Sequence, residues 1–225
     1  EIKIGNAKYV TLDDKTASAE TIDSWSETTF QKTVKIEGKE YTVTRLGLVR
    51  YVKNIPDSVT SIGRLIECSN ITIPDSVTSI GDMYRCSDIT IPDSVTSIGS
   101  SMCDCSNISI PDSITMLNGI YRSTLTIPAS VTTIKEISGE DGILCLRMES
   151  AIPPALAKAT RLAKDDMLIV PEGAAEAYKK HPVWGKFKNI SEDPRLNKDS
   201  APASKGNAGS NKEISELKKE LNELR

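Results

Sequence analysis

Ile55-Pro56-Asp57-Ser58-Val59-Thr60-Ser61-Ile62-Gly63 is the stretch that decides the fold, because the chain repeats it. Nearly identical copies begin at Ile73 and Ile91, and looser copies begin at Ile110 and Ile127. The prolines of the five copies therefore recur every 17 to 19 residues, at Pro56, Pro74, Pro92, Pro111 and Pro128. A fixed period of this length predicts a solenoid, in which each repeat forms one coil that stacks on the next.

Each repeat contains a segment with the pattern of a strand. Ile71-Thr72-Ile73 alternates apolar and polar side chains, as a half-buried strand does. Pro74 lacks an amide hydrogen and Asp75-Ser76 are turn formers, so we expect the strand to end at the proline. One short strand per repeat would then pair in parallel with the next strand at about 4.8 Å. Because a single repeat buries too few side chains to fold alone, the coils must stack.

The sequence around this motif resembles that of a known protein family. The run CSNITIPDSVTSIG, Cys68 to Gly81, looks like the BspA-like leucine-rich-repeat proteins of bacterial cell surfaces. Lys32 to Gly47 is similar to that family's opening hairpin, and Leu168 to Ile190 is similar to its closing segment. The resemblance implies a β-rich solenoid of leucine-rich-repeat type, with an N-terminal hairpin cap and a C-terminal α/β cap. The repeats here are shorter than is usual in the family, which predicts a thin side opposite the strand.

These features divide the chain into segments. We expect residues 1–50 to form an N-terminal region with the capping hairpin, residues 51–137 the solenoid, and residues 138–190 the C-terminal cap. Three of the few aromatic residues fall in that cap, where they should form a lid on the last coil: Tyr178, Trp184 and Phe187. Residues 191–209 are rich in Ser, Ala, Pro and Gly, and we expect a flexible linker there.

The last segment, residues 210–225, has the pattern of an amphipathic helix. Ser210 to Glu213 fits a capping box. Four apolar side chains follow on one helical face: Ile214, Leu217, Leu221 and Leu224. Their spacing, with complementary charges beside them, favours a parallel coiled coil, whereas two heptads are marginal in water. Two alternatives stay open, namely a homo-oligomer that assembles through these four residues, and a helix that is frayed or docked.

Composition and charge exclude some classes of function. The chain has 225 residues, of which 38% are hydrophobic and only 4% aromatic, which suits a repetitive aliphatic core. Its 28 basic residues are scattered among 31 acidic ones and form no basic stripe, so nucleic acid is not an expected partner. The chain contains no run of about 18 apolar residues, so no membrane-spanning segment is predicted. Residue 1 is Glu rather than Met, and we expect a signal peptide, not present in this chain, to have been removed.

The five cysteines raise the question of disulfides and metals. Cys68, Cys86 and Cys105 occupy equivalent repeat positions, so stacking should bring them into one column. We favour a column of buried free thiols over a disulfide bridge. Cys103 and Cys105 flank Asp104 and should point to opposite sides of an extended segment. No second Cys-x-x-Cys pair and no histidine cluster accompany them, so no metal site is predicted.

A column of hydroxyl-bearing side chains is the candidate contact surface. It consists of four residues that lie between inward-facing aliphatic residues: Thr72, Thr90, Ser109 and Thr126. We expect them on the concave strand face, where they would bind a protein or glycan. The alternative is that β-branched threonine simply suits a solvated strand.

A second column carries carboxylates, at Asp57, Asp75, Asp93 and Asp112, and is interrupted by Ala129. Stacked carboxylates repel one another, and a cation such as calcium would relieve that repulsion. The simpler interpretation is that each Asp follows a proline and precedes a serine, where its oxygen would cap the turn amides.

The sequence offers almost nothing for catalysis. The single histidine, His181, precedes Pro182 at the end of a predicted helix over residues 173–180, where it is typical of a helix terminus. No nucleophile elbow, zinc-protease motif, phosphate loop or dinucleotide fingerprint is present. We therefore predict no catalytic residues, no cofactor and no enzyme activity.

The function that follows is a non-catalytic binding or adhesion module. The resemblance implies that it is extracellular or displayed on the cell surface, where its repeats meet a protein or glycan of a host or bacterial surface. The alternative is a structural spacer or assembly module, in which the C-terminal helix makes the specific contact.

Overall fold

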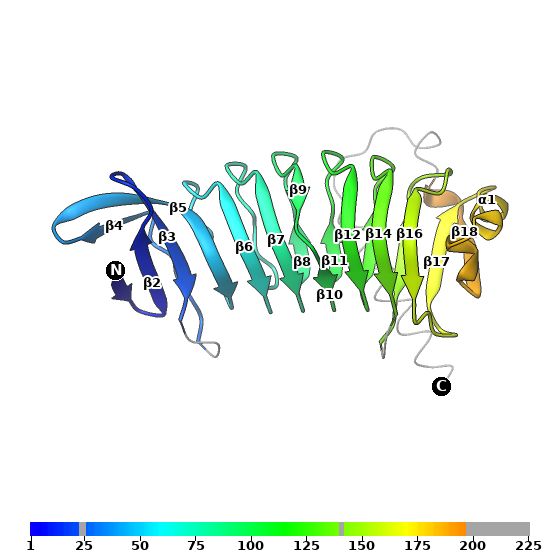
Figure 1. Ribbon diagram of the computed structural model, residues 1–225, viewed down its shortest axis with the longest axis horizontal. Coiled ribbons are helices and arrows are strands. Elements are labelled where there is room, and N and C mark those ends of the chain that lie inside the picture. The colour runs from blue at the N-terminus through cyan, green and yellow to red at the C-terminus, as the bar shows by residue number, and fades with distance from the viewer. Residues whose placement is uncertain (23–25, 140–141, 197–225) are drawn as a thin grey trace.

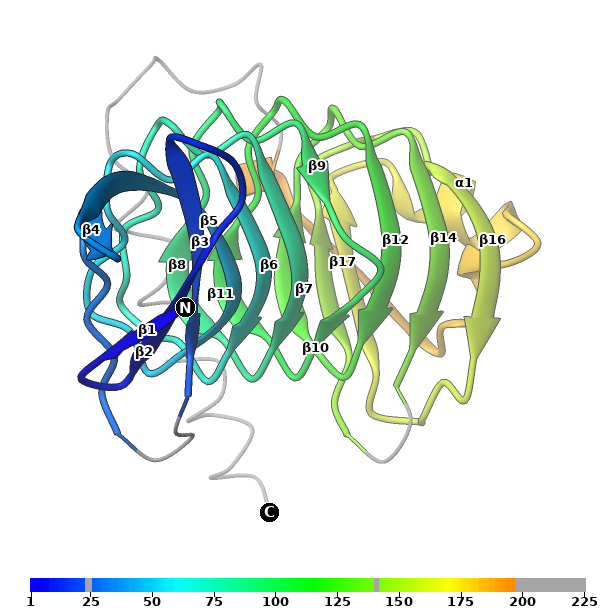
Figure 2. The same ribbon diagram turned by 60° about the vertical axis from the view of Figure 1, so that its left-hand side comes forward.

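The solenoid consists of two β-sheets that run side by side along its length (Figure 1 and Figure 2). The computed structural model describes residues 1–22, 26–139 and 142–196. Within these ranges the strands form one sheet of twelve strands and one of six. The predicted stacking is confirmed, because equivalent residues of successive repeats pair in parallel, as Ile62 does with Ile80 and Ile89 with Ile108.

The twelve-stranded sheet is built from the segment that follows each Pro-Asp-Ser turn. Its parallel part comprises β5 (Lys39–Arg50), β6 (Ser61–Ile66), β7 (Ser79–Tyr84), β10 (Met102–Cys103), β12 (Met116–Tyr121), β14 (Thr133–Ser138) and β16 (Ala155–Thr160), and β9 (Ser97–Ile98) pairs with β7. The expectation of one strand per repeat was therefore wrong. Most repeats contribute two strands, one to each sheet.

A glycine in these strands explains why their buried and exposed side chains do not alternate as in a regular strand. In β7 the buried side chains are Ile80 and Met83, three residues apart, instead of alternating. Gly81 lies between them and approaches the preceding coil closely. A Cβ atom added to Gly81 would lie 1.7 Å from the carbonyl oxygen of Gly63. Only glycine fits at this point, and it breaks the period of two that marks a strand.

The six-stranded sheet contains the strand that the sequence predicted. Its members are β8 (Ser87–Thr90), β11 (Ser106–Ser109), β13 (Thr124–Ile127), β15 (Cys145–Met148), β17 (Met167–Pro171) and β18 (Asn189–Asp193). As expected, β8, β11 and β13 end before Pro92, Pro111 and Pro128. One coil earlier, Thr72 pairs with Thr90 as an isolated parallel bridge.

The turn after each of these prolines is closed by backbone and serine groups. In the second copy the amide of Val77 donates to the carbonyl oxygen of Pro74 at 3.0 Å. The hydroxyl of Ser76 donates to the carbonyl oxygen of Val59 in the preceding coil at 2.7 Å. The expectation that the aspartate caps the turn amides was wrong for Asp75 and Asp93, because their side chains form no hydrogen bond within the described part of the chain and the proline carbonyl accepts the bond from the valine amide. The aspartate is left pointing outward.

The core is a continuous stack of aliphatic side chains with a column of thiols at one corner. Cys68, Cys86 and Cys105 are each about 1% exposed and unpaired, so the prediction of buried free thiols is confirmed. Hydrogen bonding with Cys105 and burial raise the pKa of Cys86 to about 12, which keeps this thiol protonated. Cys103 lies outside this column, and its sulfur contacts a guanidinium nitrogen of Arg122 at 3.0 Å.

The N-terminal end is sealed by antiparallel strands. β4 (Thr33–Ile36) and β5 form the predicted hairpin, with Gly38 in the turn at φ 81°. Three further strands extend the sheet beyond it, namely β1 (Ile2–Ile4), β2 (Ala7–Thr11) and β3 (Thr16–Thr21), and β3 pairs in parallel with β5. The exposed end of the first coil is thereby covered.

The coils continue through the segment that was expected to be only a cap. Thr133 pairs with Ala155, Cys145 with Met167, and Met167 with Asn189, so the step from coil to coil lengthens to 22 residues. The added residues include α1 (Ala175–Lys180) and the 3₁₀ turns η1 (Trp184–Lys186) and η2 (Pro194–Leu196). Since β18 and η2 occupy residues 189–196, the linker expected from residue 191 is ordered structure up to Leu196.

The predicted aromatic lid lies at this end of the molecule. Tyr178 and Trp184 are fully buried and meet edge to face, with ring centroids 5.8 Å apart, and Phe187 stacks on Trp184 at 6.1 Å. The indole nitrogen of Trp184 donates to the carbonyl oxygen of Pro154 at 2.8 Å. The predicted helix over residues 210–225, with Ile214, Leu217, Leu221 and Leu224, lies outside the described residues. Within the described ranges, no helix has the length and apolar character needed to cross a membrane.

Candidate binding groove

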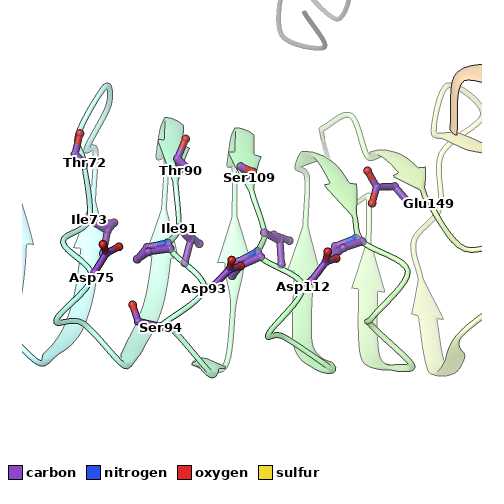
Figure 3. Close-up of a pocket in the computed structure, with 14 residues that line it drawn as sticks. Thr72, Ile73, Asp75, Thr90, Ile91, Asp93, Ser94, Ser109, Asp112 and Glu149 are labelled. Carbon is purple, nitrogen blue, oxygen red and sulfur yellow. The ribbon is translucent and has the colours of Figure 1, made fainter. Parts of the chain in front are cut away.

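An open groove of about 780 Å³ crosses several coils beside the six-stranded sheet (Figure 3). It begins near Thr72 and reaches Pro128 and Glu149, so its long direction follows the solenoid axis. Successive parallel strands lie about 4.8 Å apart, and a ligand along the groove therefore meets the same groups again at each coil. The groove has a hydroxyl row, a carboxylate row and an apolar strip of isoleucines and prolines.

The hydroxyl row is the column that the sequence singled out. Strand register aligns Thr72 with Thr90, Thr90 with Ser109, and Ser109 with Thr126. Thr72, Thr90 and Ser109 line the groove, and the first two are exposed. Thr126 is half-buried and is not part of the lining. The structure thus brings three of the four predicted contact residues together at one concave site.

The carboxylate row runs parallel to the hydroxyls. Asp75, Asp93 and Asp112 follow the prolines of successive coils and are exposed, and Glu149 closes the far end. No lysine, arginine or histidine is among the described residues that line the groove. Within the described part of the chain, the side chains of Asp75 and Asp93 form no hydrogen bond or ion pair. Asp75 and Asp93 therefore present two exposed carboxylates to the groove, and no cationic side chain among the described residues pairs with them.

The fourth aspartate of the column has a partner. Asp57 occupies the same position in the first repeat, and its carboxylate contacts the ammonium group of Lys32 at 2.8 Å. Both side chains are well exposed, so the pair contributes little to stability. The pair nevertheless shows that a carboxylate at this repeat position can hold a primary amine.

The hydroxyl column ends at a buried ion pair. Thr126 pairs with Arg147, which is 7% exposed and contacts the carboxylate of Asp193 at 2.7 Å. Arg195 contacts the same carboxylate at 2.9 Å. Hydrogen bonds from Arg195 and Arg147 lower the pKa of Asp193 to about 2, so the carboxylate stays ionised. These contacts anchor the C-terminal turn beyond the end of the groove.

A second charged column, which sequence reasoning missed, lies at the corner between the two sheets. Glu67 contacts Arg85 at 3.3 Å, and Asp104 contacts Arg122 at 2.8 Å. All four residues have left-handed backbone conformations, with φ between 46° and 54°. The signal was present, because each residue directly precedes the cysteine or serine of the thiol column, and the charges alternate in sign from coil to coil. Here every carboxylate faces an arginine, unlike in the groove.

His181 ends α1, and its Nδ1 accepts hydrogen bonds from the amides of Val183 and Trp184 at 3.2 and 3.3 Å. It therefore holds the turn into η1. Among the described residues, no group of three or more His, Cys, Asp or Glu side chains is arranged to hold a metal ion.

Two solved structures are similar to the chain at low identity. A leucine-rich repeat protein from Bacteroides ovatus ATCC 8483 is 16% identical, with 86% of this chain and 76% of that one covered and a TM-score of 0.35. A leucine rich cell surface protein from Faecalibacterium prausnitzii A2-165 is 13% identical, with 85% of this chain and 94% of that one covered and a TM-score of 0.34. No protein-family model matches the chain, and neither does any curated protein.

Proposed function

We propose that this chain is a non-catalytic binding module, which takes a segment of a protein or glycan into the groove over Thr72, Thr90 and Ser109. The observation that carries the proposal is the coincidence of the two predicted rows in one groove. Hydroxyls and outward-facing carboxylates recur there on consecutive coils of a rigid sheet. A repeated set of identical groups suits an extended ligand, because each coil offers the ligand the same contacts.

Binding is favoured over catalysis by the sameness of these groups. General acid–base chemistry needs two groups whose environments drive their pKa values apart. The groove instead repeats one carboxylate position, with exposed members at Asp75, Asp93 and Asp112. Such a row supplies charge and hydrogen-bond acceptors, which are what recognition of an extended ligand requires.

The proposed setting is the outside of a bacterial cell, with adhesion as the role. This part of the proposal is supported by the resemblance of Cys68 to Gly81, and of both ends of the solenoid, to BspA-like surface proteins. The rival function, a spacer that assembles through Ile214, Leu217, Leu221 and Leu224, stays a prediction.

The proposal is tested by filling the groove. In the variant Thr72→Trp/Thr90→Trp, two indoles replace exposed threonines at the groove. Thr78→Trp/Thr96→Trp is the matched control, since Thr78 and Thr96 are also exposed but do not line the groove. Both variants and the parent chain are assayed by biolayer interferometry against immobilised matrix proteins, bacterial surface proteins and a glycan panel.

We expect the groove variant to lose at least about tenfold in affinity for the ligand that the parent chain binds, because a filled groove excludes the ligand. The control should bind as the parent does. Equal affinities of the parent chain and the groove variant would reject the groove as the binding site and would favour the spacer function.

A further inference from the structure

The thiol column places three cysteines on consecutive coils, and the proposed groove does not use them: Cys68, Cys86 and Cys105. Backbone bonds join their coils at this level. The amide of Ser87 donates to the carbonyl oxygen of Cys68 at 3.1 Å, and the amide of Ser106 donates to that of Cys86 at 3.0 Å. Each thiol therefore lies next to the equivalent thiol of the neighbouring coil.

The spacing of the coils allows neighbouring thiols of the column to form a disulfide. Paired strands lie about 4.8 Å apart, which falls within the roughly 4.4–6.8 Å that separates the Cα atoms of disulfide-bonded cysteines. Cys68 and Cys105 are two coil steps apart, about 10 Å, and this distance is too long for a bridge. Cys86 is therefore the necessary member of any bridge within the column, and the column holds one bridge at a time.

Cys105 is the better placed partner of Cys86. The strands that begin directly after these two cysteines, β8 and β11, pair in one constant parallel register. The coil of Cys68, by contrast, is joined to β8 only by isolated bridges. A hydrogen bond from the Cys86 thiol also lowers the pKa of Cys105, which favours the thiolate, the form in which a cysteine reacts.

Both cysteines are buried, yet each lies only one residue away from the surface. Exposed Arg85 directly precedes Cys86, and half-buried Ser106 directly follows Cys105. An oxidant has to pass between side chains to reach the sulfur atoms, so a small molecule such as hydrogen peroxide suits this column better than a bulky disulfide does.

We infer that Cys86 and Cys105 form a reversible disulfide when the protein meets a hydroperoxide, while Cys68 stays a thiol. The sulfur of Cys105 attacks one peroxide oxygen, the O–O bond breaks, and a sulfenic acid forms as the leaving hydroxide takes up the proton of Cys105. The sulfur of Cys86 then displaces the sulfenic hydroxyl group, which leaves as water with the proton of Cys86. Two thiols and one hydrogen peroxide thus give one disulfide and two molecules of water.

The bridge would act on the middle of the solenoid. It would join the first ends of β8 and β11, whose last residues are Thr90 and Ser109 of the groove. It would also close a loop over residues 86–105, and closing a loop stabilises a protein by constraining its unfolded chain. Oxidation should therefore hold these two coils together and make the solenoid more resistant to unfolding.

The test follows the cysteines of the full chain after treatment with hydrogen peroxide. Free thiols are blocked with iodoacetamide in denaturant, and the chain is cut with a protease that cleaves before aspartate. Asp82 and Asp104 then begin the separate peptides that carry Cys86 and Cys105, and Cys103 ends a third peptide. Mass spectrometry of these peptides identifies which cysteines are bridged.

Two variants make the same change within the column. Cys86→Ser removes the necessary member of the bridge, and Cys68→Ser is the matched control, which leaves the bridging pair in place. Serine fits this column, because Ser123 occupies it one coil further on and its hydroxyl accepts a hydrogen bond from the amide of Cys105 at 3.0 Å. Thermal unfolding of each reduced variant checks that the fold is intact.

We expect one bridge, between Cys86 and Cys105, in the parent chain and in Cys68→Ser, and no bridge in Cys86→Ser. The bridge should raise the thermal midpoint by about 5 °C or more, and dithiothreitol should reverse the change. A bridge between any other two cysteines would overturn the inference. Five unbridged cysteines in the peroxide-treated parent chain would overturn it as well, and this result does not depend on the folding of either variant.

Discussion

Serine and aspartate, adjacent in every Pro-Asp-Ser turn, have separate roles. The serine hydroxyl bonds to a carbonyl of the preceding coil at 2.6 to 2.9 Å in all five copies. The serine therefore fixes the turn on its neighbour, and the aspartate is not needed for that purpose. These separate roles leave the carboxylates of Asp75 and Asp93 exposed at the groove, so replacing them by asparagine should leave the fold unchanged.

Gly81 gives a direct residue-scale test of the coil packing. We expect Gly81→Ala to destabilise the protein by about 2–3 kcal/mol, because the new Cβ would meet the backbone oxygen of Gly63 and the coils would have to shift. The free energy of unfolding is measured by urea denaturation.

Gly47 supplies the control for that measurement. A Cβ at Gly47 would lie 3.5 Å from the nearest atom, the carboxylate oxygen of Glu20, which is an ordinary contact. Gly47→Ala should therefore stay within about 1 kcal/mol of the parent chain. If the two alanine variants were equally stable, the close approach of the coils at Gly81 would be refuted.

At the residue scale, the sequence predicts those side-chain columns whose members are the same residue type at equivalent positions of each repeat. The hydroxyl row, the carboxylate row and the thiol column follow from equivalent positions, and the structure aligns all three. The pairing of Asp57 with Lys32 was not predictable in this way, since Lys32 lies in the hairpin, outside the repeats. The alternating ladder from Glu67 to Arg122 was hidden for a related reason, because its members differ in type from one copy to the next.

At the scale of elements, the strand that ends at each proline was predicted, and the strand that follows each turn was not. Ile71-Thr72-Ile73 alternates, whereas Ile80 and Met83 are separated by Gly81-Asp82, so the second strand has no period of two. The coils after residue 138 were not predicted, because their step lengthens to 22 residues and they lack the Pro-Asp-Ser motif. Pro171 keeps the old turn, as the amide of Ala174 donates to its carbonyl at 3.0 Å.

The lid over the last coil is testable at the same scale. We expect Trp184→Ala to lower the free energy of unfolding by about 3 kcal/mol or more, because Trp184 is fully buried between Tyr178 and Phe187 and its indole bonds to Pro154. Ile152→Ala is the control, since Ile152 is 77% exposed and its loss should cost little. An unchanged thermal midpoint for the tryptophan variant would show that the lid does not seal the solenoid.

At the scale of the whole molecule, the two ends and the side of the solenoid have different tasks. The antiparallel strands lie at one end of the coil stack (Figure 1), and the aromatic lid of Tyr178, Trp184 and Phe187 covers the other. The side between them carries the groove, where the same hydroxyl and carboxylate positions recur from coil to coil. Affinity should therefore depend on how many coils a ligand spans, because each coil adds one set of contacts.

The most direct test of the claim that this side is the binding surface is an NMR titration of the full chain with the protein or glycan that binds the parent chain in the interferometry assay. Amide resonances are followed along the chain, so the binding site is located without any substitution. The account predicts that the largest shift changes occur at Thr72, Thr90 and Ser109 and in the Pro-Asp-Ser turns beside them. Changes confined to the strands of the twelve-stranded sheet or to the two ends, with the groove amides unmoved, would contradict it.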